Sequence, residues 1–496
     1  MNAGQEMTKT LAFVATAVLI LAIAFFSRPS KEQAVVDDEV GKVMFPALSE
    51  SSMVNGLEVL SFDEDLGQMS RFKVAQQDQG PFVIPSHQNY PADAQARLVN
   101  AATMFVDLNV VRVVQSTEAD FETFGVVEPS TTETRVGDEG VGMLVTVFGK
   151  GEQGQTTLAD LIVGKPVKGL PEQHYVRRPG KSRVYQVKIN PTQLSTRFQD
   201  WIETDLLKLS LFDVGALTLK DYSVETEGFN ITGYDQRLEL RATVADDGWV
   251  LDDLKEGVNG ELQAGQVEEG EALNQTRLNV LRNALGELKI VDVQRKPRGL
   301  GADLKASGEF LGDPESARSL ADRGFYSIKF QDGSSKFLSS DGELLVDTKT
   351  GVRYTLRFGR IAGVGEATKS DAGESETSLN RFMFVSVSLN EDLFPEPELE
   401  ELPEADENDN EVALEIERIQ KANQRKTDER NDAMEAAKQK VEDLRYRFAD
   451  WYYIVAEDVF KKLRLRRNDL FSFSGDALKS GTGIQAFREL QREGLK

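Results

Sequence analysis

The feature that most constrains the fold of this chain is an internal repeat, in which Arg97–Gln115 returns in degraded form as Arg277–Gln294. The two stretches read RLVNAATMFVDLNVVRVVQ and RLNVLRNALGELKIVDVQ, and in both an amphipathic helical pattern runs into an alternating strand pattern. At one offset of 180 residues the matched pairs are Arg97 and Arg277, Leu98 and Leu278, Leu108 and Leu288, Val111 and Val291, and Val113 and Val293. The repeat predicts a chain that folds as two copies of one unit.

Stretches on either side of the repeat also match. Arg71–Ile84, RFKVAQQDQGPFVI, has a polar turn between two apolar runs, and so has Leu238–Leu251, LELRATVADDGWVL. Leu161–Lys165 is answered by Leu356–Arg360 at an offset of 195 residues. We therefore expect each copy to contain several antiparallel strands and one amphipathic helix.

A five-residue pattern recurs near the end of each copy, as Arg197–Trp201, RFQDW, and as Arg447–Trp451, RFADW. The simplest interpretation is a helix whose Phe and Trp enter the core while Arg and Asp pair or cap. The alternative is a site at which a ligand stacks on the aromatic rings. If the two patterns belong to the repeat, Trp201 and Trp451 should occupy equivalent positions.

One segment is apolar enough to cross a membrane. Thr10–Phe26 contains 17 consecutive uncharged and mostly apolar residues, which as a helix span about 26 Å. Lys9 and Arg28 flank the segment and can reach the two interfaces. A retained anchor is preferred to a cleaved signal peptide or a buried core helix, because the apolar run continues through Phe25 and Phe26 past the possible cleavage site Ala22-Ile23-Ala24. The flanking charges do not set the orientation.

The second copy carries an insertion. From Glu391 to Glu417 there are 13 Asp or Glu and no Lys or Arg, a composition typical of a solvated, flexible linker. A helical pattern follows, in which Met434, Ala437, Val441, Leu444, Phe448 and Trp451 recur at spacings of three and four. The pattern suits a helix packed on its own domain and a coiled coil equally well.

These observations predict an α+β protein with an N-terminal transmembrane helix and two related domains of antiparallel strands plus a helix, the second with an acidic and long-helical insertion. The predicted segments are an anchor at 8–27, a tether at 28–55, a first repeat at 56–220, a second repeat at 221–390, an acidic linker at 391–417, a helical segment completing the second repeat at 418–470 and a C-terminal tail at 471–496.

Composition excludes some functions. The 82 acidic and 58 basic side chains give a net charge of -24, and binding to nucleic acid requires a basic surface rather than an acidic one. The chain has no cysteine, so disulfides, thiolate metal sites and cysteine nucleophiles are excluded.

A glycine-rich stretch matches a nucleotide-binding pattern in its residues but not in its predicted secondary structure. Gly149–Gly154, GKGEQG, fits G-x-G-x-x-G after a predicted strand, but the following QTTLADLIVG is strand-like. Without a helix N-terminus there is no dipole to hold a pyrophosphate, so we interpret the stretch as a hairpin turn.

Metal-binding patterns are weak. His87 and His174 are the only histidines, too few for a His-rich site, and His174 is predicted on the surface at the start of a strand. The acidic run lacks the order of a calcium loop, and nothing in the sequence pairs two carboxylates.

A basic patch is predicted near a hairpin tip, consisting of Arg177, Arg178, Lys181 and Arg183. We interpret it as a solvated hairpin. Contact with an anionic partner, a lipid head group or the chain's own acidic segment is the alternative.

Several stretches resemble the bacterial family called domain of unknown function 4340. They are GVVEP at Gly125–Pro129, LIVGK at Leu161–Lys165, YVRRPGKSRVYQV at Tyr175–Val187 and the strand beginning at Trp249, and the similarity covers about residues 57–221 and, more weakly, the second copy. The resemblance implies a single-pass membrane protein with its bulk outside the cytoplasm, often encoded beside ABC-type transport components of the kind linked to gliding motility. The family has no established catalytic residues, so none is carried over.

We therefore expect a non-enzymatic, membrane-anchored accessory or scaffold protein of an envelope complex, associated with an ABC-type transport system. It is expected in the cell inner membrane as a single-pass protein with most of the chain extracytoplasmic. The alternative is an extracytoplasmic binding module that recognises an envelope polymer or peptide through exposed strands, and an enzyme with a carboxylate site is a third hypothesis. We predict no catalytic, cofactor-binding or metal-binding residues, no cofactor and no nucleic-acid partner.

Overall fold

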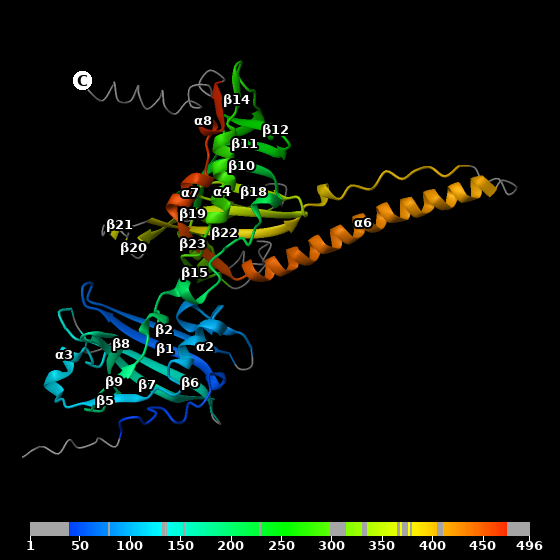
Figure 1. Cartoon of the computed structure of the whole chain (residues 1–496). Coiled ribbons are helices and arrows are strands. Elements are labelled where there is room, and N and C mark those ends of the chain that lie inside the picture. Colours follow the sequence, from blue (N-terminus) through cyan, green and yellow to red (C-terminus); the bar gives the residue numbers. More distant parts are fainter. Residues whose placement is uncertain are drawn as a thin grey trace, which may run out of the picture. The chain divides into compact units, whose positions relative to one another are not determined.

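The structure is a computed structural model that describes residues 39–77, 80–130, 134, 136–151, 154–227, 230–297, 314–329, 335–364, 368–369, 375–376, 379–403 and 410–473. Mostly antiparallel strands form two nine-stranded sheets, accompanied by helices (Figure 1). The predicted α+β class is confirmed. The predicted anchor at 8–27 lies outside the described residues, and within the described part no helix is long and apolar enough to cross a membrane.

The first sheet has the strand order β4-β3-β2-β1-β6-β7-β8-β9-β5. Helix α2 (Gln95–Thr103) lies between β4 and β5 in the chain, and α3 (Phe121–Phe124) between β5 and β6. The strands are β1 (Val54–Asp63), β2 (Gln68–Gln76), β3 (Phe82–Ile84), β4 (Tyr90–Pro91), β5 (Val110–Val114), β6 (Met143–Gly151), β7 (Gly154–Val167), β8 (Leu170–Arg177) and β9 (Val184–Lys188).

The second sheet has the order β13-β12-β11-β10-β18-β19-β22-β23-β15. Its strands are β10 (Val214–Glu227), β11 (Asn230–Ala245), β12 (Gly248–Val258), β13 (Glu261–Ala264), β15 (Asp292–Arg295), β18 (Glu343–Thr348), β19 (Val352–Val364), β22 (Leu379–Leu389) and β23 (Trp451–Ala456).

Helices and strand pairs accompany the second sheet. The helices are α4 (Gln275–Glu287), α5 (Pro314–Asp322), α6 (Asn410–Phe448), α7 (Glu457–Leu463) and α8 (Arg467–Leu470). The two-stranded pairs are β14 (Glu271–Leu273) with β24 (Phe471–Phe473), β16 (Phe325–Lys329) with β17 (Ser335–Ser339), and β20 (Thr368–Lys369) with β21 (Ser375–Glu376).

The two sheets share one strand order. Numbered along the chain within its own sheet, each reads fourth, third, second, first, sixth, seventh, eighth, ninth, fifth. The registers agree as well, because Val113 pairs with Tyr185 in the first sheet and Val293 pairs with Tyr453 in the second. Val113 and Val293 are the residues that the offset of 180 matches.

The recurring RFxDW pattern does not follow this equivalence. Trp201 lies after β9, whereas Trp451 is the first residue of β23, the strand that takes the place of β9. With Tyr185 and Tyr453 aligned, Trp451 corresponds to Arg183. The prediction that Trp201 and Trp451 are equivalent is therefore wrong: both rings are buried, but Trp201 lies in a 3-10 helix and Trp451 begins a strand.

Alternation of side chains builds the inner face of the first sheet. Leu57 and Val59 on β1, and Val145 and Val147 on β6, are all fully buried, while the residues between them are half-buried on the opposite face. β-Branched residues suit this pleated surface, and each buried Val or Leu contributes about 1.5–3 kcal/mol.

The outer face of each sheet is partly covered by a segment that contains a short helix. This helix is α3 in the first sheet and α5 in the second. Beside α3, the buried side chains of Val126, Ile162 and Val184 form one cluster. Beside α5, a larger aromatic cluster contains Leu320, Phe325, Phe337, Phe382, Phe384, Tyr452 and Ile454. In both sheets, some strand residues on the outer face are therefore buried beneath the covering segment.

The described chain divides into two compact units. One consists of the described residues up to Arg71 together with Val99–Leu194, and the other of Phe72–Leu98 together with the described residues from Ser195 onward. This division differs from the predicted boundary at residues 220 and 221, because Phe72–Leu98 groups with the second unit.

Packing begins before the predicted start of the first repeat at residue 56. Met44, Phe45 and Leu48 are buried, and the Met44 amide donates to the Leu108 carbonyl at 2.8 Å. This part of the predicted tether at 28–55 therefore belongs to the packed unit.

The insertion of the second copy is the connection between β22 and β23. In the first sheet the same connection, from β8 to β9, is residues 178–183. Helix α6 begins at Asn410, inside the predicted acidic linker, and β23 lies within the predicted helical segment at 418–470. The C-terminal part of α6, where Ala437, Val441 and Leu444 are buried, contacts β19 and β22 of its own unit, and the rest extends away from these strands (Figure 1).

Candidate functional site

Three of the stretches that carry the family resemblance meet around one buried arginine in the first unit. Arg177, on β8, is 5% exposed. Its Nε donates to the Val126 carbonyl at 2.9 Å, its Nη1 donates to the Lys181 carbonyl at 2.8 Å, and its Nη2 lies 3.6 Å from a carboxylate oxygen of Glu128. Arg177 thus ties the GVVEP loop to the β8–β9 hairpin.

The charge of Arg177 is balanced locally. Burial lowers its pKa, and the carboxylates of Glu128 and Glu118 offset part of this effect. Arginine stays protonated, so its guanidinium must keep its acceptors. It also lies 4.3 Å from the centre of the Phe121 ring, a cation–π contact. The position of Glu128 is fixed in return, because Glu128 also accepts from the Gly180 amide at 3.0 Å.

Two glycines allow the LIVGK stretch to approach the GVVEP loop. A Cβ at Gly164 would lie 2.5 Å from the Phe124 carbonyl oxygen, closer than real Cβ atoms come. Gly125 has a φ of 69°, in the left-handed region that favours glycine. The Lys165 ammonium donates to the Glu122 carbonyl at 3.3 Å. The motif glycines therefore have a structural role.

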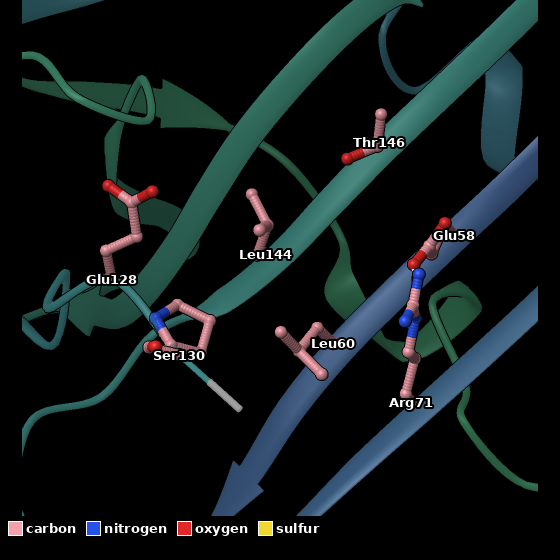
Figure 2. Close-up of a pocket in the computed structure, with 8 residues that line it drawn as sticks. Glu58, Leu60, Arg71, Glu128, Ser130, Leu144 and Thr146 are labelled. Carbon is pink, nitrogen blue, oxygen red and sulfur yellow. The ribbon is translucent and has the colours of Figure 1, made fainter. Parts of the chain in front are cut away.

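The loop fixed in this way forms one wall of a pocket of about 550 Å³ in the first unit. Figure 2 shows Glu128 on one side, the Glu58 and Arg71 side chains facing each other on the other, and Leu60 and Leu144 between them. The lining residues are Glu58, Leu60, Arg71, Glu128, Pro129, Ser130, Leu144 and Thr146.

Strand alternation places these side chains. Glu58 and Leu60 on β1, and Leu144 and Thr146 on β6, point to the outer face because their neighbours fill the inner core. The side chain of Arg71, on β2, is 65% exposed, and its Nε lies 2.5 Å from the Glu58 carboxylate. Because the Arg71 end of this ion pair is solvated, the pair contributes at most about 1 kcal/mol, and the Arg71 guanidinium is accessible to a charged ligand in the pocket.

The pocket offers binding chemistry. Charged groups stand at two sides, hydroxyl groups lie at Ser130 and Thr146, and the floor is aliphatic. Among the described residues no group of three or more His, Asp or Glu side chains is arranged to hold a metal ion. The arrangement suits a small polar ligand or a segment of another protein.

A second constellation lies in the other unit and resembles a catalytic triad in composition. The Ser86 hydroxyl is 2.9 Å from His87 Nδ1, and His87 Nε2 is 3.5 Å from Asp292. The second distance is beyond a normal hydrogen bond. Burial, the larger effect, lowers the pKa of His87, and burial raises that of Asp292, which weakens the ion pair. Ser86 is exposed, and the imidazole stacks on Phe198 with 4.1 Å between ring centres. We interpret the set as packing.

The glycine-rich stretch is a hairpin turn, as predicted. Gly151 and Gly154 are paired at the ends of β6 and β7, and a strand rather than a helix follows. No phosphate-binding helix N-terminus therefore stands after this turn.

The predicted basic patch is only partly a solvated surface: Lys181 and Arg183 are exposed, whereas Arg178 is half-buried. Arg177 is buried, the Arg178 guanidinium lies 5.2 Å from the Phe45 ring centre, and Arg183 forms an ion pair with Glu39 at 2.9 Å. The solvated interpretation is wrong for Arg177, because a covering loop buries the outer face of β8. The contact of Arg183 with an acidic residue of the same chain agrees with the alternative interpretation.

The predicted surface position of His174 is also wrong. His174 lies within β8 and is 8% exposed, facing the inside of the sheet. Strand alternation gives the reason, since Val176 on the same face is fully buried.

Both RFxDW patterns place Phe and Trp in the core, as predicted. Phe198 and Trp201 are buried in a 3-10 helix, while Phe448 is buried at the end of α6 and Trp451 at the start of β23. The Arg447 guanidinium donates to the Asp205 carbonyl at 2.6 Å. No ligand-stacking surface is left on these rings.

Sequence reasoning missed the pocket residues Glu58, Arg71 and Thr146. Their signal is weak, because polar residues at alternate strand positions are what any solvated sheet face shows. Only the covering loop, which strand periodicity does not reveal, turns that face into a pocket. The GVVEP stretch was recognised, and it supplies Glu128 and Pro129 to the lining.

Part of the chain matches a known family. Residues 83–307 match the family model described as Domain of unknown function (DUF4340). The match confirms the resemblance inferred from the motifs, although it begins later than expected and continues into the second sheet. No curated protein and no solved structure matches the chain.

Proposed function

With residues 83–307 belonging to the family described as Domain of unknown function (DUF4340), we propose that the chain is a non-enzymatic, membrane-anchored accessory or scaffold protein of an envelope complex. Its proposed partner is an ABC-type transport system. The apolar segment Thr10–Phe26 supports an anchor in the inner membrane, with most of the chain extracytoplasmic.

The scaffold is proposed to consist of two related domains. The shared strand order and the equal register of Val113 with Tyr185 and of Val293 with Tyr453 support a duplication. Two copies of one sheet give the scaffold two similar bodies. The segments that join the strands differ between the copies, and each can contact a different partner.

The observation that carries the proposal is the arm, which we define as residues 395–403 together with the N-terminal part of α6, residues 410–433. Helix α6 has 39 residues, or about 58 Å at 1.5 Å per residue. Only its C-terminal part contacts the sheet, so the arm places side chains well away from the body of its unit (Figure 1). An extended element of this kind serves contact with another protein rather than the stability of the fold.

The arm is held together as a defined element. The Arg430 guanidinium donates to the Phe394 carbonyl at 3.0 Å, the Lys426 ammonium donates to the Glu398 carbonyl at 3.2 Å, and the Asn423 amide donates to the Glu400 carbonyl at 2.8 Å. These bonds run along the helix in antiparallel order. Residues 395–403 therefore line α6 as an extended strap.

The surface of the arm combines satisfied charges with exposed leucines. Glu417 with Lys421 and Arg425 with Glu429 form ion pairs one helical turn apart, which support a solvated helix. Leu399, Leu402 and Leu414 are 54%, 49% and 68% exposed. Side chains of this size on an otherwise charged arm are the expected contact residues for a partner.

Purification of the tagged chain from its own membranes in a mild detergent, followed by mass spectrometry, tests the proposal. The matched variant lacks residues 396–429, with Pro395 joined to Arg430 through two glycines, because the Arg430 side chain already reaches the Pro395 carbonyl at 3.1 Å. We expect ABC-type subunits with the intact chain and their loss with the variant.

A finer variant separates the leucines from the length of the arm. Leu399, Leu402 and Leu414 are changed to Asp, and the control carries Asp at Leu66 and Leu170, which are 66% and 48% exposed in the first unit. Loss of the partner with the arm variant alone supports the proposal. Recovery of the chain alone, or with wall polymer, from the intact protein would refute it and favour the binding-module alternative, for which the pocket of Figure 2 is available.

The proposed topology has its own test. The chain has no cysteine, so a single cysteine at Asn2 or at Ser182 reports cleanly on a thiol reagent that does not cross membranes. Labelling of Ser182→Cys but not of Asn2→Cys in intact cells supports an extracytoplasmic body. The reverse pattern would overturn it.

A further inference from the structure

One inward-facing position carries a basic side chain in both sheets, but the surroundings of this side chain differ between the sheets. His174 on β8 pairs with Pro166 on β7 and with Val187 on β9. Arg381 on β22 pairs with Ile361 on β19 and with Val455 on β23. Pro166 and Ile361 are matched by the same offset of 195 residues as LIVGK and its counterpart, so His174 and Arg381 are structurally equivalent.

In the second sheet this position is fully satisfied by protein groups. Arg381 is 6% exposed. Its guanidinium binds Glu457 through two hydrogen bonds of 2.6 and 3.0 Å and Asp341 at 2.8 Å, and it lies 3.9 Å from the centre of the Phe460 ring. Glu457 and Phe460 both belong to α7, the helix that directly follows β23. Helix α7 therefore covers the buried cation.

In the first sheet no such helix follows β9. The chain forms only a short 3-10 turn, Pro191–Gln193, and a pocket of about 750 Å³ remains, with His174 in its lining. His174 is 8% exposed, and its Nδ1 has no hydrogen-bond partner among the described residues. Buried polar atoms are almost always paired, so an unpaired ring nitrogen at the wall of a pocket points to a ligand group.

The protonation state of the His174 imidazole determines which hydrogen-bonding group a ligand must present to it. Burial lowers the pKa of His174, and a hydrogen bond to the Ile189 backbone offsets part of this effect. The ring is therefore neutral at physiological pH. With Nε2–H assigned as the donor to the Ile189 carbonyl, Nδ1 is left as an acceptor. The ligand must then present a donor, an N–H or O–H group.

The other residues that line the pocket limit the chemical class of the ligand. Asp107 and Glu172 place carboxylates at the rim, and Lys188 neutralises one of them through an ion pair with Glu172 at 2.6 Å. The net charge of the rim is negative, which disfavours an anionic ligand. The apolar part consists of aliphatic side chains and prolines, and the described lining residues include no Phe, Tyr or Trp on which a sugar or base could stack. The apolar residues are Met104, Val106, Leu108, Val111, Pro171, Ile189 and Pro191.

We propose that this pocket binds an aliphatic peptide segment, with an amine or amide N–H of the segment donated to Nδ1 of His174. The peptide takes the place that α7 fills in the second sheet. The volume lies within the range of known ligand sites, and the inference does not depend on the transport role.

The chain has two histidines, which makes imidazole NMR a direct test. The full-length chain, labelled with nitrogen-15 in histidine, gives signals from His87 and His174, and a His87→Gln variant assigns them. Three probes are added to about 10 mM, which detects dissociation constants in the millimolar range. They are leucine amide (an ammonium), N-acetyl-leucine amide (a neutral N–H donor) and N-acetyl-leucine (a carboxylate).

We expect leucine amide to shift the Nδ1 signal of His174 and leave that of His87 unchanged. N-acetyl-leucine amide should bind more weakly, and N-acetyl-leucine roughly tenfold more weakly than leucine amide, because its charge meets the negative rim. A Val111→Trp variant places a large ring in the pocket while leaving the His174 residue itself unchanged, and it should abolish the response. Val258→Trp is the matched control, since Val111 and Val258 are strand valines that are each 45% exposed.

Three outcomes would overturn the proposal. They are an unmoved His174 signal with all three probes, a response that persists in Val111→Trp, and a stronger response to N-acetyl-leucine than to leucine amide. Loss of the response in Val258→Trp as well would also count against it, because the effect would then not belong to this pocket.

Discussion

Replacing Lys296 with methionine should stabilise the protein at neutral pH. Lys296 is 7% exposed. Its ammonium donates to the Phe448 carbonyl at 2.9 Å and lies 3.9 Å from the centre of the Phe384 ring. Burial lowers its pKa to about 7, and Asp450 offsets only part of this effect. A buried lysine with one carbonyl acceptor is poorly compensated.

The size of the effect follows from this pKa. The fall from 10.5 to about 7, at 1.36 kcal/mol per unit, corresponds to a cost of about 5 kcal/mol for keeping the charge inside. Between these two values the unfolded chain holds the proton and the folded chain does not. The stability contributed by Lys296 therefore rises as the pH rises through this window. The variant also loses the hydrogen bond to Phe448, worth about 1 kcal/mol.

At pH 7, where the folded lysine is half titrated, these two values leave Lys296→Met more stable than the natural chain by about 3–4 kcal/mol. The advantage should vanish as the pH approaches 10. The assay is urea unfolding of the full-length chain at several pH values, followed by tryptophan fluorescence. Trp201, Trp249 and Trp451, the three tryptophans of the chain, are all buried in the same unit as Lys296.

The matched control is Lys289→Met, which replaces an exposed lysine close by in sequence. It should change the stability little, because substitutions at exposed positions usually do so. A difference between Lys296→Met and the natural chain that stays constant from pH 7 to pH 10 would refute the reasoning, as would a variant that is less stable at pH 7.

Further predictions concern both units. Arg177→Met should destabilise the first unit by roughly 3–5 kcal/mol, measured by thermal unfolding with circular dichroism, because buried acceptors lose their donor; an unchanged melting temperature would contradict this. Gly164→Ala should cost roughly 1–3 kcal/mol, since its Cβ would meet a carbonyl at 2.5 Å. Gly215→Ala, whose nearest neighbour is at 3.4 Å, should change stability by less than about 1 kcal/mol in the same assay. Because burial lowers the pKa of His87 from 6.5, stability should fall as the pH drops below that value, and His87→Phe, which keeps the stack on Phe198, should flatten this loss.

The repeat was visible in the sequence where the two copies share backbone constraints. The offset of 180 residues matched Val113 with Val293, and both pair with a tyrosine at the same place in their sheets. Val293 is buried and Val113 half-buried, and each must fit the same kind of neighbour on the adjacent strand, so their spacing is kept. This is why the fold class could be predicted from alternation and offsets.

The RFxDW recurrence shows the limit of the same reasoning. A pattern of five residues is short enough to arise wherever two aromatic rings enter a core, and its two occurrences lie in different kinds of element. Trp451 begins β23, whereas Trp201 lies beyond β9. Only the register with a neighbouring strand shows whether two similar short sequences occupy equivalent positions in the repeat.

The candidate sites were harder to predict because they depend on what covers a sheet. Arg177 lies on the outer face of β8, where alternation predicts solvent, yet the GVVEP loop buries it. His174 lies on the inner face, where alternation predicts burial, yet no helix follows β9 to cover it completely. In both cases a segment distant from the strand in sequence decides the environment.

The place of the arm in the chain has a consequence for its variability. Because it leaves from β22 and returns to β23, adjacent strands of one sheet, its two ends start close together, and lengthening such an excursion costs little chain entropy. Removing seven residues from α6 and a matching piece of the strap would shorten its reach by about 10 Å while every strand kept its partner. The length of the arm can thus change without altering the sheet that supports it.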